Sequence, residues 1–273
     1  MKIIQSYKAK QVMEGAGVPV RRVFSQGETK AFDPFLLLDY LVVPPNTQTP
    51  GFPWHPHRGI ETITYILKGE ARHEDSIGNK GPIATGELQW MSAGGGIYHQ
   101  EMLGECEEGV QGFQFWLNLP AKDKMNPPEY LYIRQGEMPI VSLSEAEVRV
   151  ISGTYAGVRG PINKDNLGVS MLHIGLKAGE RFELTRDEQK QGFIFVFEGS
   201  GTLDSQVLEN ETGYTLGAGQ GTVLAGEEGL AFIYAEGKPL VEPIAWMGPV
   251  VMNTDEELKQ AFYELRKGTF AKY

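Results

Sequence analysis

Short apolar runs, each closed by a glycine or proline turn, constrain the fold of this chain more than any other feature. The 273 residues include 34 glycines and 16 prolines, spread evenly along the sequence. Runs rich in β-branched and aromatic residues lie between them, for example Phe35–Val43, Thr62–Leu67, Phe113–Leu119, Val148–Ser152, Phe193–Phe197 and Leu230–Ala235. Many short strands at regular spacing indicate an antiparallel sandwich or barrel. We therefore expect an all-β protein.

One segment near the end of the sequence has the pattern of an α-helix. Thr254 can cap its start, and Glu257 three residues later can complete a capping box. A single apolar stripe follows, made of Leu258, Ala261, Phe262 and Leu265. Gly268 is placed to end the helix. We expect a short helix that packs on the strands.

A faint internal repeat divides the sequence into two halves. Residues 65–71 (YILKGEA) resemble residues 195–201 (FVFEGSG), since each segment is a strand that runs into a glycine turn. We therefore expect two similar β-barrels in tandem. The predicted boundaries are residues 1–135 for the N-terminal barrel, 136–146 for a linker, and 147–273 for the C-terminal barrel with the helix.

Composition and charge narrow the class of function. The mean hydropathy is −0.26, and the sequence has no apolar run near the length that spans a membrane, so we expect no membrane segment. Cys106 is the only cysteine, which excludes an intrachain disulfide and favours a cytoplasmic location. The net charge of −10 should repel phosphate backbones, so we expect no direct binding of nucleic acid.

The residues suited to chemistry lie in two matched pairs. His55 and His57 are two residues apart, and so are His99 and Glu101. Residues i and i+2 of a strand point to the same face, so each pair can aim two ligand atoms at one point. Three imidazoles and one carboxylate would bind a divalent metal and leave two positions open in an octahedral shell. A structural zinc site would normally contain sulfur, and no set of cysteines lies nearby.

The sequence blocks around these pairs resemble a known family. Residues 55–62 (HPHRGIET), 86–99 (GELQWMSAGGGIYH) and 248–254 (GPVVMNT) are similar to conserved blocks of the pirins. The resemblance spans nearly the whole chain. One position departs from the pattern, because many pirins carry a bulky basic residue where this chain has Gly95.

The resemblance implies a fold and a metal site. Pirins are bicupins, so it implies two tandem cupin barrels with one metal in the N-terminal barrel. The four ligands of the family correspond to His55, His57, His99 and Glu101. Iron is the expected metal; copper, nickel, manganese, cobalt and zinc remain open because such ligand sets accept several metals.

Glu61 is a second candidate carboxylate. Cupins in general use a glutamate there as a metal ligand, whereas the pirin pattern uses the position of Glu101. We expect Glu101 to ligate the metal and to accept the hydroxyl proton of a substrate. Glu61, four residues after His57, is then expected to share its strand face and orient an imidazole. The alternative for Glu61 is a pair with Arg58.

The two remaining histidines have simpler expected roles. His73 lies beyond the glycine turn of the first motif, and we expect a hydrogen-bonded structural residue. His173 alternates with apolar neighbours, so it should face the second barrel, which lacks the paired ligands. Five residues could line a flat pocket or belong to the core, namely Trp90, Met91, Phe113, Phe115 and Trp116.

Two functions follow from the resemblance. Some pirins cleave the flavonol quercetin with dioxygen, which implies a metal-dependent dioxygenase that takes a small planar aromatic substrate, with Glu101 and Glu61 as the catalytic carboxylates. Others act through protein partners. The alternative is therefore a non-enzymatic regulatory protein in which the redox state of the metal alters the surface that a protein partner contacts.

Overall fold

The chain folds into two compact units that are each assembled from separate segments. The computed structural model describes residues 1–103, 105–106, 108–143, 146–162 and 167–273. We call first unit the residues 10–26, 35–135 and 240–273, and second unit the residues 1–9, 27–34 and 136–239. This division differs from the predicted boundaries, because the beginning of the chain belongs with the second half and its last 34 residues belong with the first half.

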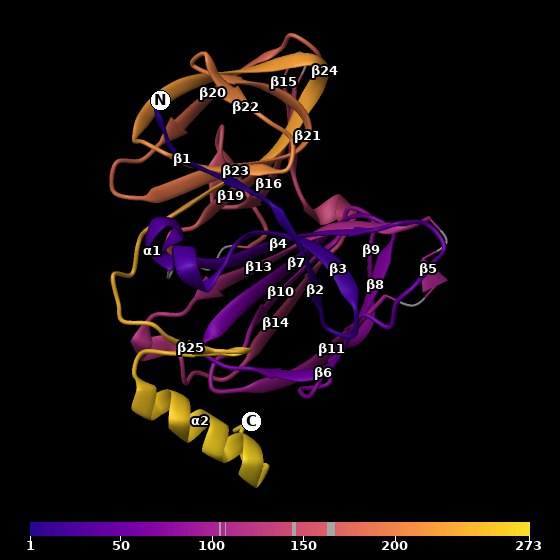
Figure 1. Cartoon of the computed structure of the whole chain (residues 1–273), viewed down its shortest axis with the longest axis vertical. Coiled ribbons are helices and arrows are strands. Elements are labelled where there is room, and N and C mark those ends of the chain that lie inside the picture. The colour runs from indigo at the N-terminus through magenta and orange to yellow at the C-terminus, as the bar shows by residue number, and fades with distance from the viewer. Residues whose placement is uncertain (104, 107, 144–145, 163–166) are drawn as a thin grey trace. The chain divides into compact units, whose positions relative to one another are not determined.

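The second unit contains one large antiparallel sheet (Figure 1). Its main path has the order β1-β23-β21-β24-β19-β16-β15, while β20 pairs with β24 and β22 with β21. The strands are β1 (Ile3–Lys8), β15 (Ile140–Leu143), β16 (Ala146–Ser152), β17 (Thr154–Tyr155), β18 (Val158–Arg159), β19 (Ser170–Leu176), β20 (Arg181–Arg186), β21 (Gln191–Leu203), β22 (Gln206–Leu208), β23 (Thr212–Leu216) and β24 (Gly219–Gly237). Short helices α1 (Thr29–Phe32), η1 (Gln26–Glu28) and η3 (Gln135–Glu137) lie at its chain connections.

The core of the second unit follows from strand alternation. Val148 and Val150 of β16 are buried with Leu172 and Ile174 of β19, while residues between them point the other way. Part of the predicted linker is itself a strand, because Ile140–Leu143 pairs with β16. Residues 144–145 of that linker lie outside the described residues.

The first unit contains two larger sheets (Figure 1). One has the order β14-β10-β7-β13-β4-β3-β2 and the other the order β6-β11-β8-β9. The strands are β2 (Lys10–Glu14), β3 (Val18–Phe24), β4 (Phe35–Val43), β5 (Thr47–Gln48), β6 (Phe52–His57), β7 (Ile60–Lys68), β8 (Glu70–Asp75), β9 (Lys80–Ala84), β10 (Leu88–Ser92), β11 (Ile97–Met102), β12 (Glu105–Cys106), β13 (Val110–Asn118), β14 (Glu129–Ile133), β25 (Ala245–Met247) and β26 (Val250–Met252). A short helix η2 (Ala121–Asp123) follows β13.

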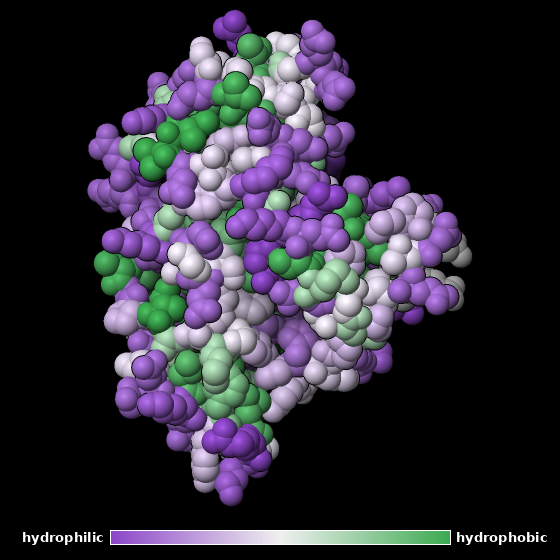
Figure 2. Space-filling model, viewed as in Figure 1, coloured by the Kyte–Doolittle hydropathy of each residue, from purple (hydrophilic) through white to green (hydrophobic). Residues whose placement is uncertain are grey.

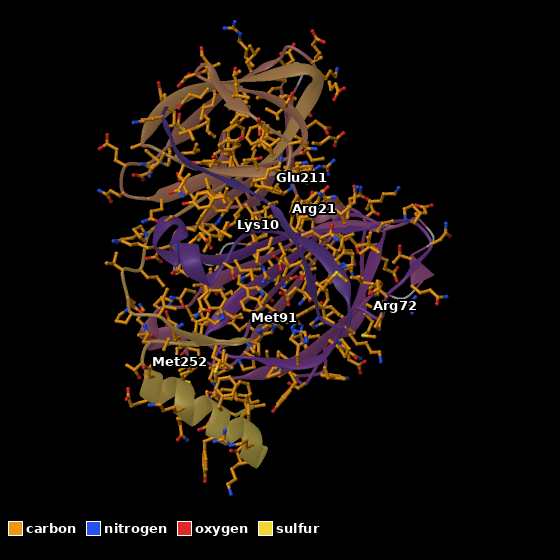
Figure 3. All side chains as sticks on the ribbon, viewed as in Figure 1. Lys10, Arg21, Arg72, Met91, Glu211 and Met252 are labelled. Atoms are coloured by element: carbon orange, nitrogen blue, oxygen red, sulfur yellow. The ribbon has the colours of Figure 1, made fainter. Side chains whose placement is uncertain are left out.

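The last segment of the first unit carries the predicted helix, α2 (Asp255–Lys267). Thr254 and Glu257 form the capping box, and Gly268 ends the helix in the left-handed conformation, so both ends are as predicted. Met252 lies beside α2 and shares a small core with Ala261 (Figure 3). The segment is thereby anchored to the unit that contains β6 and β11.

The internal repeat corresponds to one structural device used twice. Gly69 ends β7 and Gly199 interrupts β21, and both have a positive φ. A Cβ at Gly69 would lie 2.4 Å from the carbonyl oxygen of Gly109, and one at Gly199 would lie 2.2 Å from that of Gly229. No side chain fits at either position. The repeat seen in the sequence thus marks an equivalent glycine in each unit, where the backbone of one strand approaches another backbone segment too closely for a side chain.

Hydrophilic residues cover much of the face shown in Figure 2, with smaller hydrophobic areas between them. Among the described residues, no helix combines the length and the apolar character needed to cross a membrane.

Candidate metal centre

Two neighbouring strands of the first unit hold the paired residues. β6 and β11 are antiparallel, with His55 opposite His99 and His57 opposite Ile97. The i, i+2 spacing places His55 and His57 on one face of β6, as the sequence predicted. The register brings His99 of β11 to the same place.

The three imidazoles form a compact cluster. One nitrogen from each of His55, His57 and His99 can be chosen so that all three lie within 4.8 Å of one another. Their ring centroids are 4.3 Å apart for His55 and His99, 4.8 Å for His55 and His57, and 5.0 Å for His57 and His99. A single ion at the centre of such a triangle can contact all three nitrogens.

The hydrogen bonds of the histidines suit a metal. His55 Nδ1 lies 2.8 Å from the Pro53 carbonyl oxygen, and His57 Nδ1 lies 3.2 Å from that of Pro249. A carbonyl only accepts, so each Nδ1 carries the proton and each Nε2 keeps a free lone pair. His99 is fully buried, and neither ring nitrogen has a hydrogen-bond partner among the described residues. Buried polar atoms without partners are rare, and a bound metal would satisfy one of them.

Burial favours the neutral form of His57 and His99. Burial, reinforced by the neighbouring histidines, holds the pKa of His99 well below its ordinary value. Burial and the adjacent His55 lower the pKa of His57 in the same way, although the bond to the Pro249 carbonyl opposes the shift. Neutral imidazole is the form that binds metals. The site is therefore ready for a cation at neutral pH.

Glu101 lies in the same cavity as His55 and His57 and is hydrogen-bonded to β7, a strand of the other large sheet of the first unit. Thr64 Oγ1 is 2.7 Å from Glu101 Oε1 and 2.8 Å from Gln114 Oε1. A hydroxyl has one proton, so Thr64 donates to one of these oxygens, and a flipped Gln114 amide would donate to Thr64. The role of Glu101 as a fourth ligand stays a prediction.

Glu61 lies in a different environment from the one its spacing suggested. β6 ends at His57 and the chain turns at Gly59 before β7, so Glu61 does not continue the strand face of His57. Glu61 Oε2 accepts a hydrogen bond from Trp90 Nε1 at 3.1 Å. Arg58, its alternative partner, instead donates to Glu264 at 2.7 Å. The position of Glu61 was predicted wrongly because the sequence does not show that β6 ends at His57.

A cavity of about 460 Å³ opens beside the histidines in the first unit. Its apolar wall includes Val20, Leu37, Leu41, Ile66, Leu103 and Phe113. A row of polar residues crosses five adjacent strands, in the order Gln89, Thr64, Gln114, Asp39 and Arg22. The last four line the cavity. The cavity therefore combines an apolar wall with a band of hydrogen-bonding groups.

The comparisons with known proteins agree with this geometry. The Pirin family matches residues 17–117, and the Pirin C-terminal cupin domain matches residues 171–271. A pirin-like protein from Caulobacter vibrioides is 36% identical over 274 residues, which cover 98% of each chain. The crystal structure of a quercetin 2,3-dioxygenase from Acinetobacter baumannii is 34% identical, covers 98% of each chain and superimposes with a TM-score of 0.91.

The chain belongs to the pirin family. It has two cupin domains, and the predicted all-β bicupin with a short helix near its C-terminal end is confirmed.

The segment after residue 240 contributes to this pirin's site in a way that was not predicted. Pro249 holds His57, and Trp246 and Gly248 line the cavity. The Trp246 ring lies 5.9 Å from Trp116, whose ring in turn contacts His57 edge-on at 4.9 Å. The family resemblance at residues 248–254 was the one signal, since distance along the chain hides the contact.

The segment is fixed by two buried basic side chains. Arg58 donates to the carbonyl oxygens of Gly95 and Phe270 as well as to Glu264. Lys124 donates to the carbonyl oxygens of Gly59 and Val251 and to Asn118. Both side chains hold the turn that follows His57.

The other predicted residues also have clear positions. His73 is buried and hydrogen-bonded to Asp75, as expected for a structural histidine. His173 lies in β19 of the second unit, with its ring 5.3 Å from Phe197, and burial lowers its pKa to about 4. Of the aromatic set, Phe113 and Trp116 line the cavity.

Proposed function

We propose that this chain is a metal-dependent dioxygenase that cleaves quercetin-like flavonols with dioxygen. The observation that carries the proposal is the cluster of three histidines, two of which, His55 and His57, line a cavity large enough for a small aromatic molecule. The relative from Acinetobacter baumannii, named as a quercetin 2,3-dioxygenase, supports the choice of substrate.

His55, His57, His99 and Glu101 would hold the metal. A divalent transition metal, expected to be iron, would supply Lewis acidity and redox activity at the end of the cavity. The chain has the donors for it, because each histidine has at least one ring nitrogen free of hydrogen bonds within the described structure.

The cavity favours a neutral planar substrate over an organic acid. Glu14, Asp39 and Glu101 line it, and among the described lining residues Arg22 is the one guanidinium or ammonium group. Arg22 is already paired, with Nε 2.9 Å and Nη2 2.7 Å from the two Asp39 oxygens and Nη2 2.8 Å from Glu14. Arg22 therefore has no unpaired charge to offer an anionic substrate, whereas phenolic hydroxyls can donate to the carboxylates of the lining.

Glu101 would take the proton of the substrate hydroxyl. Its carboxylate lines the cavity, and Thr64 Oγ1 lies 2.7 Å from Oε1, so the threonine hydroxyl orients it. Gln114, next to Thr64, offers an amide for a second contact with the substrate. Trp116 and Phe113 provide flat apolar surface for the rings.

The test is quercetin consumption by metal-loaded protein, followed in air and without oxygen. We expect turnover in air, none without oxygen, and none in His99→Ala in either condition. His173→Ala is the matched control, because it removes a histidine from the other unit and should retain turnover. If fully loaded wild-type protein leaves quercetin and related flavonols intact in air, the proposal fails and the regulatory alternative replaces it.

A further inference from the structure

A fourth histidine lies behind the cluster. β8 pairs with β11 so that Asp75 is opposite His99 and His73 is opposite Glu101. The side chains of His73 and Asp75 are fully buried, whereas that of Arg72, which precedes His73, is 78% exposed on the outer side (Figure 3). Strand alternation thus directs His73 and Asp75 inward, beside the proposed metal ligands.

Asp75 holds His73 in one orientation. Asp75 Oδ1 accepts from the backbone N–H groups of Ile77 at 3.1 Å and Asn79 at 2.9 Å. Its other oxygen, Oδ2, is 2.8 Å from the Asn79 amide and 3.1 Å from His73 Nε2. The His73 ring also stacks on Tyr130, with centroids 4.9 Å apart and an interplanar angle of 24°. The ring has little freedom to turn.

The Asp75 contact fixes the tautomer of His73. A carboxylate only accepts, so the proton of a neutral His73 is on Nε2. Nδ1 is then an acceptor, and it is buried without a hydrogen-bond partner in the described part of the chain. Buried acceptors of this kind call for an explanation, and a donor close by would supply one.

His99 has a ring N–H that also lacks a hydrogen-bond partner among the described residues. A neutral imidazole carries one N–H, and within the described residues neither nitrogen of His99 has a partner. The centroids of the His73 and His99 rings are only 5.4 Å apart. An unpaired donor and an unpaired acceptor therefore lie on adjacent buried rings. His55 and His57 use Nδ1 for their oxygen partners, which suggests Nδ1 for His99 too.

We propose that Asp75 and His73 form a positioning relay that sets the tautomer of His99. Asp75 accepts from His73 Nε2–H, and His73 Nδ1 accepts from His99 Nδ1–H. His99 Nε2 is then left with a lone pair for the metal. The described structure shows the two rings adjacent but without a hydrogen bond between them, so the relay requires the His99 ring to turn its Nδ1–H toward His73 Nδ1.

The relay adds two positioning residues to the metal site proposed above and therefore rests on that proposal. Its first test needs neither metal nor substrate. NMR of metal-free protein with isotope-labelled histidine reports which ring nitrogen carries each proton. We expect Nε2–H on His73 and Nδ1–H on His99. The reverse tautomer on either ring in wild-type protein would overturn the relay, whatever the protein does with quercetin.

Asp75→Asn is the sharpest variant. The two backbone N–H donors keep the amide oxygen on their side, so the amide nitrogen turns toward His73 Nε2. His73 must then accept there and carry its proton on Nδ1, which leaves two donors facing each other. We expect the His73 tautomer to switch and the metal affinity to fall roughly 10–100-fold, with full metal content at saturation.

Two substitutions of His73 separate positioning from packing. His73→Asn keeps an oxygen near the position of Nδ1 and should retain most of the affinity. His73→Gln keeps a polar group near Nε2 but loses the acceptor, and should lose affinity as Asp75→Asn does. Equal affinities in these two variants, or an unchanged affinity in Asp75→Asn with a switched tautomer, would contradict the relay. Absence of quercetin turnover with the expected tautomers would contradict only the proposed function.

Discussion

His99 is the residue on which the candidate site depends most. It is buried, and its ring is adjacent to those of His55 and His57. We expect His55→Ala, His57→Ala and His99→Ala each to abolish stoichiometric metal binding, because two imidazoles hold an ion poorly. Elemental analysis of the purified variants checks this. His173→Ala should keep its full metal content. Full metal content in His99→Ala would contradict the proposed site.

Glu101 should matter for proton transfer. Glu101→Gln keeps the shape and the Thr64 contact but cannot accept a proton at neutral pH. We expect kcat for quercetin to fall about 10²–10⁴-fold, with a smaller change in KM. Steady-state kinetics together with metal analysis measure both effects.

Glu61→Gln is the comparison for Glu101. Its carboxylate contacts Trp90, so the loss of activity should be smaller, of order 10–100-fold or less. A Glu61→Gln protein that loses its metal while Glu101→Gln keeps it would reverse the assignment of the two carboxylates.

At the scale of residues, the sequence predicted the histidine pairs and not the groups that hold them. The i, i+2 spacing is a local property, so the sequence alone is enough to place His55 and His57 on one strand face. Thr64 and Pro249 lie far from their partners in the chain, and their contacts depend on strand register and on the path of the C-terminal segment. Such contacts have no local signature.

Among the elements, the turn after β6 depends on a buried lysine. Lys124 is 1% exposed, and burial lowers its pKa from 10.5 to about 7. Between pH 7 and pH 10.5, Lys124 is protonated in the unfolded chain and largely deprotonated in the folded protein. The free energy of unfolding should therefore rise by up to about 1.4 kcal/mol for each pH unit in this range. Below pH 7 this contribution is flat.

Lys124→Met should remove that part of the pH dependence. Denaturant unfolding at several pH values between 7 and 10 measures the slope, and exposed Lys122→Met is the control that should retain it. Identical slopes for Lys124→Met and wild type would mean that the three oxygens around Nζ keep the ammonium charged.

Helix α2 gives a second prediction at this scale. Thr254→Ala removes the side-chain acceptor for the Glu257 N–H and should lower stability by about 0.5–2 kcal/mol. Thermal unfolding of Thr254→Ala and Thr254→Ser tests it, since serine keeps the cap. Equal losses in both variants would show that the cap does not stabilise the helix.

The individual strands and the helix were more predictable from the sequence than the contacts between residues. The run Phe35–Val43 is β4 to the residue, and the capping box marks the start of α2. Both signals are contained in a few neighbouring residues. The end of β6 was not predictable, because a turn at Gly59 interrupts what reads as one continuous strand.

Across the whole molecule, chain segments are shared between the halves. β1 pairs with β23, more than 200 residues away, and the segment from Leu240 returns to the first unit. Antiparallel pairing of this range is decided by the complete fold. The predicted division at residues 136–146 therefore assigned residues 1–9 and the last 34 residues to other halves than the compact units do. The tandem architecture itself was predictable from the repeat.

The central claim is that one metal binds to the histidine cluster of the first cupin domain. Diffraction from crystals grown with iron(II), recorded at the iron absorption edge, tests it most directly. We predict one anomalous peak per chain, about 2 Å from a nitrogen of each of His55, His57 and His99 and next to a Glu101 oxygen. A peak at His173, or no peak between the three histidines, would contradict it.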